Sequence, residues 1–453
     1  MKFSTEMQGQ VRELFVAGLK AEFEGKENIT VGEVEQRLRA MLVEIGAQSL
    51  GAYLSSQDEA YPADALACPC GGQAKYVSRK AAKVKSVFDW ATYHRAYYLC
   101  AECHQGQKPL DQKLGLAPGK VTAGLADLLG VAGVETSFET GKQLIERYLL
   151  VEISENTLRE ETQAFGELQE KIEADWLEKS QDPDWLQEHL RTQPAIPQRL
   201  YGSLDGAHAP LNEEWREMKI GCWFEVEMSA KERVSNDRPA QVGKTDTLRA
   251  KHITYYCDLD QAEQFGKLLW ATGCQRGADL AAEIVFIADG AAWIWNLVSL
   301  YYPQAVQIVD WYHAEGYLEP IAKALFPEDL RTRQHWLDET RTWLWEGQTQ
   351  KVIAICAQLS HHPQAGDWAQ KAGTYYANNQ HRMDYARFRE AGYLIGSGSV
   401  ESGCKQIVTQ RLKRPGARWT KWGARLTAKA RAAWLSLQWD RLVHLRALVP
   451  LTA

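Results

Sequence analysis

The stretch AEIVFIADGAAWIWNLV, residues 282–298, decides the fold that we expect for this chain. It begins with a continuous apolar run that is typical of a buried strand, and this run ends at Asp289 with Gly290 behind it. A similar pattern in QAVQIVDWYHAEGYL, residues 304–318, predicts a further buried strand that opens a helix. Strands and helices therefore alternate in this part of the chain.

Three more strands are predicted upstream of this stretch. Their sequences are RLYGSLDGAHAP (199–210), GCWFEVEMS (221–229) and KHITYYCDL (251–259), and a helical pattern over 260–278 follows them. Three hairpin-like strands followed by strands that alternate with helices are the order of a ribonuclease H-like mixed sheet, in which the first and fourth strands are neighbours. We therefore expect an α+β multidomain chain in which this sheet is a catalytic core, its first part over 196–324.

Two aspartates follow from this arrangement as candidate site residues. Asp205, after the first apolar run, and Asp289 would emerge from the ends of neighbouring strands. Two carboxylates a few ångströms apart repel each other, so a divalent cation between them is the natural reason to place them there. For either aspartate alone, a plain Asp-Gly turn is the alternative.

The stretch GSGSVESGC, residues 396–404, supplies a third carboxylate, Glu401. Two metal ions ~3.5 to 4 Å apart need carboxylates from at least two directions, and a glutamate on a later helix provides the remaining side. The surrounding glycines and serines predict a helix start without bulky side chains. We expect them to leave room for metal-bound phosphate and the DNA backbone.

Four cysteines predict a separate metal site over 61–108. Two pairs lie in ACPCGG (67–72) and YLCAECHQG (98–106), namely Cys68, Cys70, Cys100 and Cys103. Four thiolates can close a tetrahedral structural Zn²⁺ site that stabilises a domain too small for its own core. His94 and His104 are spare candidate ligands, and free thiols are the alternative.

Composition limits the class of protein. The chain has 453 residues, 45% hydrophobic and 24% charged, with no run of the ~18 apolar residues that a membrane span needs. Its first residues mix in charge, unlike a signal peptide, and its nine scattered cysteines favour a reducing compartment. We expect a cytoplasmic protein without a membrane partner. A net charge of -6 by itself argues against binding nucleic acid, although a local basic face can outweigh the total.

The remaining N-terminal regions are predicted to be helical. Residues 1–60 have apolar positions at helical spacing, and 109–195 contain a pair with helix-turn-helix proportions, from about 138 to 148 and from the N-cap Ser154 onward. The second helix could enter a major groove of DNA, and plain helical packing is the alternative. The three prolines of 181–198 predict a linker.

One basic segment follows Glu401. Residues 402–431 contain nine Lys or Arg and no Asp or Glu, with two tryptophans between them. A solvated helix face normally alternates its charges, so DNA phosphates are the expected partners of this run. The predicted DNA contacts are Lys405, Arg411, Lys413, Arg414, Arg418 and Lys421.

Four motifs together carry a family resemblance. SLDGA (203–207), FIADGAAWIW (286–295), VDWYHAEGYL (309–318) and GSGSVESG (396–403) resemble the motifs of DDE transposases of bacterial insertion sequences, most of all the ISKra group. The resemblance spans roughly residues 200–440.

The resemblance implies a site and a function. Asp205, Asp289 and Glu401 would be the catalytic triad that binds two Mg²⁺ or Mn²⁺ ions. Asp310 and His313 would match the supporting D-x-x-H element of Mutator-like and hAT relatives. An all-helical insertion over 325–392 would precede the last part of the core, 393–453. The implied activity is cleavage at terminal inverted repeats and strand transfer into target DNA, by a homodimer or larger assembly at the bacterial nucleoid.

Three alternatives remain at this point. A nuclease of the same fold would share the chemistry without strand transfer. A domesticated DNA-binding regulatory protein would carry the carboxylates as relics, and a two-carboxylate glycosidase would use the many tryptophans. The zinc module and the basic segment have no place in a glycosidase. Without the resemblance, the residues reach metal-dependent phosphodiester chemistry on DNA.

Overall fold

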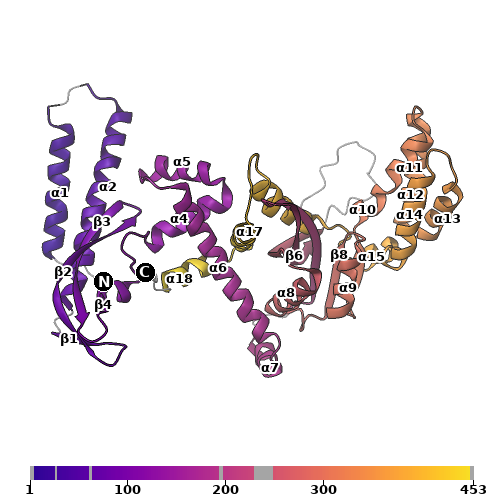
Figure 1. The fold of residues 1–453 in the computed structure, drawn as a ribbon. Coiled ribbons are helices and arrows are strands. Elements are labelled where there is room, and N and C mark those ends of the chain that lie inside the picture. Colours follow the sequence, from indigo (N-terminus) through magenta and orange to yellow (C-terminus); the bar gives the residue numbers. More distant parts are fainter. Residues whose placement is uncertain (1–4, 26–27, 61–63, 193–196, 229–247, 449–453) are drawn as a thin grey trace. The chain divides into compact units, whose positions relative to one another are not determined.

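The computed structural model describes residues 5–25, 28–60, 64–192, 197–228 and 248–448. The chain divides into two compact units, Met1–Leu168 with Gln438–Ala453, and Gln169–Leu437 (Figure 1). In contrast to the segments expected from the sequence, the helix Trp439–Leu448 belongs to the first unit, and the boundary between the units falls within one helix.

The first unit begins with the predicted helices. These are α1 (Thr5–Phe23) and α2 (Val31–Ser56), which pack against each other. Helix α2 begins with a capping box, in which the side chain of Thr30 accepts the backbone N–H of Glu33 while the Glu33 carboxylate accepts the backbone N–H of Thr30. The helical prediction for 1–60 is confirmed for the described residues.

A four-stranded antiparallel sheet follows, in the order β1-β2-β3-β4. Its strands are β1 (Ala65–Ala67), β2 (Gln73–Ser86), β3 (Asp89–Cys100) and β4 (Gly106–Gln107). Beside the sheet, α3 (Pro109–Leu114) supplies Asp111, which pairs with Arg95 while both are buried and also accepts the hydroxyl of Tyr93. This buried group fixes α3 on the sheet, because each buried charge depends on the other as its partner.

The helix-turn-helix proportions predicted within 109–195 are present. Helices α4 (Ala123–Glu135), α5 (Phe138–Leu149) and α6 (Glu155–Lys179) follow one another, and Ser154 accepts the backbone N–H of Thr157 at the start of α6. The linker prediction is wrong over part of 181–198, because α7 (Pro183–Thr192) begins at the first of its prolines. Proline is favourable in the first turn of a helix, where its missing N–H costs nothing.

The second unit contains a five-stranded mixed sheet in the order β7-β6-β5-β8-β9. The elements alternate as predicted: β5 (Arg199–Pro210), β6 (Trp215–Met228), β7 (Leu248–Asp258), α8 (Ala262–Gln275), β8 (Glu283–Ala288), α9 (Ala292–Tyr301), β9 (Val306–Val309) and α10 (Trp311–Gly316). The first and fourth strands, β5 and β8, are parallel neighbours. The mixed α+β sheet and its predicted strand adjacency are thus confirmed.

Helices cover both faces of this sheet. On one face, the indole N–H of Trp223 in β6 donates to Thr272 of α8. On the other face, α16 (Gly398–Gly403) packs so closely that a Cβ at Gly403 would meet Tyr255 and Ile220, and the hydroxyl of Ser436 accepts the backbone N–H of Tyr255. The sheet core is therefore buried on both sides.

Helices occupy the region predicted as an insertion (Figure 1). In order they are α11 (Leu318–Leu325), α12 (Leu330–Trp345), α13 (Thr349–Leu359), α14 (Gly366–Asn379), η2 (Gln380–Arg382) and α15 (Tyr385–Glu390). After α16 come η3 (Cys404–Leu412), which is a π-helix, α17 (Lys421–Leu435) and α18 (Trp439–Leu448). The all-helical character expected for 325–392 is confirmed in the described structure.

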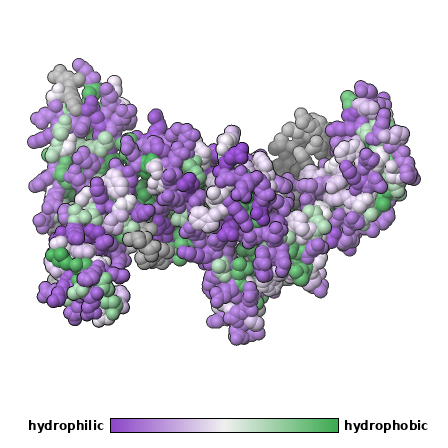
Figure 2. Space-filling model, in the orientation of Figure 1, coloured by the Kyte–Doolittle hydropathy of each residue, from purple (hydrophilic) through white to green (hydrophobic). Residues whose placement is uncertain are grey.

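One face of the molecule is mostly polar. Figure 2 shows hydrophilic residues over most of the face in view, with hydrophobic residues in separate small groups. In the described part of the chain, no helix has both the length and the apolar character needed to cross a membrane.

A buried ion cluster ties α17 to α6 and the sheet. Lys429 of α17 pairs with Glu173 of α6 and, at 2.7 Å, with Asp258 of β7. Burial opposes the charge of this lysine, but the two carboxylates outweigh it and raise the pKa of Lys429. These three elements, distant in sequence, therefore depend on one ammonium group.

Replacing that lysine should destabilise the second unit. Lys429→Met leaves Glu173 and Asp258 buried without their cation, which is expected to cost about 3 to 5 kcal/mol of unfolding free energy. Urea unfolding followed by tryptophan fluorescence measures this loss. Lys421→Met, at the exposed start of the same helix, is the matched control and should leave the urea midpoint unchanged. Equal midpoints for the two variants would contradict the role given to the cluster.

Candidate functional site

The β5–β8 pairing brings the two predicted aspartates level with each other. Gly202 pairs with Phe286 in parallel register, so Asp205 and Asp289, each three residues further on, lie at corresponding positions. Asp205 is not at a strand end as predicted, because β5 continues to Pro210 through its pairing with β6. Both carboxylates are half-buried.

Each aspartate is oriented by a local hydrogen bond. The carboxylate of Asp289 accepts the backbone N–H of Ala291 at 2.9 Å, and that of Asp205 accepts the backbone N–H of Gly206 at 2.7 Å. Burial raises the pKa of Asp205, and the charge of Asp289 raises it further. The charge of Asp289 therefore acts on Asp205.

Glu401 lies in α16, whose small residues have more than one purpose. A Cβ at Gly398 would meet nothing within 4 Å, which agrees with the open space expected near the carboxylate. Gly403 is different, since its missing side chain makes room for Tyr255 of the sheet. The hydroxyl of Ser397 donates to Glu401 at 2.9 Å and holds the half-exposed carboxylate.

Asp310 connects the sheet to the loop before α16. It is fully buried at the end of β9 and caps α10, where its carboxylate accepts the backbone N–H of His313 at 2.8 Å. Its second oxygen accepts the backbone N–H of Ser397. Because Ser397 in turn holds Glu401, Asp310 positions the third carboxylate without touching it.

His313 lies between Asp310 and Glu401. Its Nδ1 is 3.1 Å from Asp310 and 3.7 Å from Glu401. The hydrogen bond with Asp310 raises the pKa of His313 from 6.5 to about 9, and burial opposes this shift only in part. Burial also opposes ionisation of Asp310, but the hydrogen bonds from His313 and Ser397 lower its pKa below the usual value. The two groups are therefore an ion pair at neutral pH.

Cys404 is a site residue that the sequence reasoning did not assign. Its thiol donates to Asp205 at 3.2 Å, and burial beside that carboxylate raises the pKa of the thiol, which keeps it protonated. Cys404 follows Glu401 by three positions and begins the π-helix η3. That spacing places both residues on one helix face, a signal available in the sequence. Wide π turns are rare and are frequently found at functional sites.

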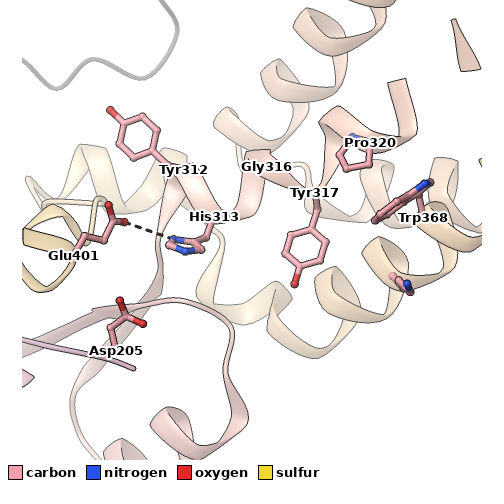
Figure 3. Close-up of a pocket in the computed structure, with 9 residues that line it drawn as sticks. Asp205, Tyr312, His313, Gly316, Tyr317, Pro320, Trp368 and Glu401 are labelled. Atoms are coloured by element: carbon pink, nitrogen blue, oxygen red, sulfur yellow. Dashed lines mark ion pairs between the residues drawn. The ribbon is translucent and has the colours of Figure 1, made fainter. Parts of the chain in front are cut away.

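These groups open onto one pocket of about 620 Å³ (Figure 3). Asp205, His313 and Glu401 lie at one end of it, and the other end is lined by Tyr317, which precedes α11, and by Trp368 of α14. Asp289 is not a lining residue, although its charge acts on both Asp205 and His313. The pocket is thus shared between the sheet, α16 and the helical insertion.

Among the described residues, potential metal ligands form two separate groups. Within each group, the donor atoms all lie within 4.8 Å of one another. One contains Asp310, His313 and Glu401, and neither Asp205 nor Asp289 belongs to it. Since both oxygens of Asp310 already accept hydrogen bonds, this residue is better suited to positioning than to ligation. The predicted triad of Asp205, Asp289 and Glu401 is therefore not such a group among the described residues.

The other group consists of the four predicted cysteines. Sγ of Cys68 lies 3.5 Å from that of Cys103, and Sγ of Cys70 lies 3.7 Å from that of Cys100. Backbone N–H groups of Cys103 and Glu102 lower the pKa of Cys100 to about 7, which favours a thiolate ligand. The two cysteine pairs predicted in the sequence lie together, and the spare histidines are not part of the group.

The predicted DNA contacts have different environments. Lys405, Arg418 and Lys421 are exposed, and Lys413 and Arg414 are half-buried. Arg411 is wrong as a surface contact, because it is 2% exposed and packs over the Trp419 ring. Other cations of the basic segment are paired within the unit, Lys429 as above and Arg425 with Glu170. The carboxylates that pair with these cations of the basic segment therefore come from segments distant in the sequence.

Comparison with known proteins adds no assignment. The chain matches no protein-family model and no curated protein.

One prediction concerns the Asp310–His313 pair. Asp310→Asn removes the main cause of the raised pKa, so the pKa of His313 should fall from about 9 toward 6.5. Titration of the His313 ring by NMR, in protein without added divalent ions, measures it. Because the folded-state pKa is the higher one, stability from this pair is complete below pH 6.5 and is lost as pH rises through about 9.

The matched control for that titration is Asp384→Asn. Asp384 also caps a helix, α15, but belongs to neither metal-ligand group. The pKa of His313 should stay at about 9 in this variant. If the pKa of His313 is unchanged in Asp310→Asn, then carboxylates other than Asp310 are responsible for raising it.

Proposed function

We propose that this protein is a metal-dependent DNA transposase with a DDE triad of Asp205, Asp289 and Glu401. The observation that carries the proposal is the convergence of Asp205 and Glu401 on one pocket, with the charge of Asp289 acting on both Asp205 and His313. Asp205 and Glu401 are 196 residues apart in the sequence, and both line this pocket. The resemblance to the ISKra group agrees with this assignment.

The donor set fits hard divalent cations. Asp205 and Asp289 offer carboxylate oxygens at neighbouring strand positions, and carboxylates are the ligands that Mg²⁺ and Mn²⁺ prefer. When bound at these carboxylates, two such ions would supply the activation of a water or a DNA 3′-hydroxyl and the stabilisation of the leaving oxygen.

The residues around the triad keep it ready for that chemistry. Ser397 and Cys404 hold Glu401 and Asp205 in their orientations, and Asp310 fixes Ser397. The His313 cation partly neutralises the carboxylates before an ion binds, which lowers the cost of keeping them together.

DNA is the proposed partner along both units. Exposed Lys405, Arg418 and Lys421 follow Glu401 and are suited to phosphate contacts that do not depend on sequence. The α5–α6 pair is suited to reading transposon ends, and the cysteine group to holding a structural Zn²⁺. The proposal includes a ribonuclease H-like core, a bacterial cytoplasmic location and assembly of two or more copies on paired ends.

The alternative function is a nuclease of the same fold. Its phosphodiester cleavage would use the same carboxylates, and it would lack the joining step. A DNA-binding regulator with inactive carboxylates is the other alternative, and an oriented and hydrogen-bonded triad is unnecessary for it.

An assay of strand cleavage and joining tests the proposal. Its substrate is labelled DNA that carries the native flanking sequences of the gene. With Mg²⁺ or Mn²⁺, we expect nicked and joined products from the native chain. Glu401→Gln removes an anionic ligand, and a loss of about 4 kcal/mol of transition-state stabilisation corresponds to about 10³-fold less of both products. Glu390→Gln, an exposed glutamate outside the pocket, should retain both.

The outcomes separate the candidate functions. Nicking without joining would favour the nuclease, and DNA binding without reaction in any variant would favour the regulator. Equal activity of native protein and Glu401→Gln would show that the triad is assigned wrongly.

The cysteine group gives a separate prediction. Purified native protein should contain one tightly bound Zn²⁺ per chain, because four thiolates at these distances suit tetrahedral Zn²⁺. The Cys103→Ala variant should lose most of this metal, and its first unit should be less stable to unfolding. Cys404→Ser, outside the group, should retain it. Iron in place of zinc, seen by elemental analysis, would contradict the identity of the ion.

A further inference from the structure

A second, smaller pocket lies next to the pocket that Asp205 and Glu401 line. Its volume is about 280 Å³, and it is lined by Arg249 of β7, Trp311 of α10 and residues of the loop 394–399. Tyr312 lines both pockets, and Figure 3 shows its side chain beside Glu401. A group bound in this second pocket, the Arg249 pocket, would therefore be a close neighbour of a group bound at the carboxylates.

The charges around the Arg249 pocket favour an anion. Among the described residues that line it, Arg249 is the one charged side chain, and this side chain is exposed. The buried carboxylate of Asp310 lies behind Gly396, 3.8 Å from where an added Cβ would be. Its charge is already compensated, because it pairs with His313 and accepts the backbone N–H of Ser397. The lining of the pocket therefore offers a cation without an opposing carboxylate.

A buried N–H group belongs to the same lining. Trp311 is 1% exposed, and its indole N–H has no hydrogen-bond acceptor within the described part of the chain. The ring is held in place by edge-to-face contacts with Trp345 and Tyr385, whose ring centroids are each 5.0 Å away. Buried polar groups without a partner are rare in folded proteins, and the indole N–H can only donate. We therefore expect a ligand in this pocket to supply the acceptor.

The rest of the lining is small or apolar. Gly396 and Gly398 both line the pocket, and a Cβ added at Gly398 would meet nothing within 4 Å. Leu248 and Leu394 also line it. The volume lies just below the range of about 300 to 1,000 Å³ that is typical of small-molecule sites. A pocket of this size and character suits one phosphate with its sugar, because the apolar side chains can contact the sugar ring.

We propose that the Arg249 pocket binds a phosphodiester group of DNA next to the one that is held at the carboxylates. Arg249 donates to its oxygens, as a planar guanidinium group is suited to do, and the indole N–H of Trp311 donates to the same group. The inference rests on the proposed function, because DNA at Asp205 and Glu401 brings the neighbouring phosphate to this position. Inorganic phosphate is the alternative source of the same chemistry.

A second phosphate contact gives the site something that the carboxylates alone do not supply. A strand held at one phosphate can still turn about that point, whereas a strand held at two neighbouring phosphates has a fixed direction. Holding the reacting group in one orientation is a large part of what catalytic sites contribute. Because phosphates are the same at every step of DNA, this contact positions the strand without reading its sequence.

The NMR signal of the Trp311 indole N–H tests the inference without any cleavage step. Full-length protein with isotope-labelled tryptophan is titrated with a short DNA duplex of mixed sequence, and Trp311→Phe identifies the signal by its loss. Ca²⁺ replaces Mg²⁺, because it also binds carboxylates and phosphates but with a looser geometry. We expect the indole proton to shift downfield as it donates to a phosphate. A parallel titration with inorganic phosphate, without Ca²⁺, should shift it only at far higher concentration.

The affinity for DNA should depend on Arg249 in the way that marks a phosphate contact. Arg249→Gln should bind DNA about tenfold more weakly, and the slope of log Kd against log salt concentration should fall by about one. Gly398→Val adds a side chain where a Cβ would meet nothing, and it should remove the shift of the Trp311 signal. Lys267→Gln is the matched control, because Lys267 is exposed on α8, which covers the other face of the sheet. It should keep the affinity, the salt slope and the shift.

The results also separate this inference from the proposed function. An unchanged affinity and salt slope in Arg249→Gln, or a Trp311 signal that moves with inorganic phosphate but not with bound DNA, overturns the DNA phosphate pocket alone. Failure of the native protein to bind DNA overturns the pocket together with the proposed function. A Trp311 shift and a weakened Arg249→Gln variant, in a native protein that never cleaves DNA with Mg²⁺, support the pocket and leave catalysis refuted.

Discussion

The parallel pairing of β5 with β8 is the constraint on which the candidate site depends. Gly202 is required there, because a Cβ would collide with the Phe286 ring across the pair. The hydroxyl of Ser203 continues the contact by donating to the backbone carbonyl of Ile287. Only this register carries Asp205 to the level of Asp289, and a shift by one residue would turn the side chain of Asp205 to the opposite face of the sheet.

Asp310 extends this alignment from the sheet to the third carboxylate. A buried carboxylate is expensive unless its oxygens accept hydrogen bonds, and Asp310 meets that requirement through His313 on one side and Ser397 on the other. The need to satisfy one buried charge therefore fixes α10 and the loop before α16 together. That loop positions Glu401, which lies 91 residues after Asp310 in the sequence.

The sequence predicted what depends on local patterns and missed what depends on distant partners. Apolar runs and helical periodicity were sufficient for the strand order around Asp205 and for the helices of 325–392. The buried position of Arg411 and the neutralisation of Lys429 were missed, because the groups that enclose them come from segments far away in the sequence. A run of like charges in the sequence predicts a charged surface only when no oppositely charged residues from distant segments pair with it.

Gly290 shows how one residue can serve two levels of the structure. In the sequence its place after Asp289 indicates a turn, yet in the fold its missing side chain also makes room for Tyr375 of the insertion. The helical insertion is consequently not an independent appendage, because its α14 rests on the backbone that presents the second aspartate. The contact of Tyr375 with Gly290 therefore joins the helical insertion directly to the turn that carries the second aspartate.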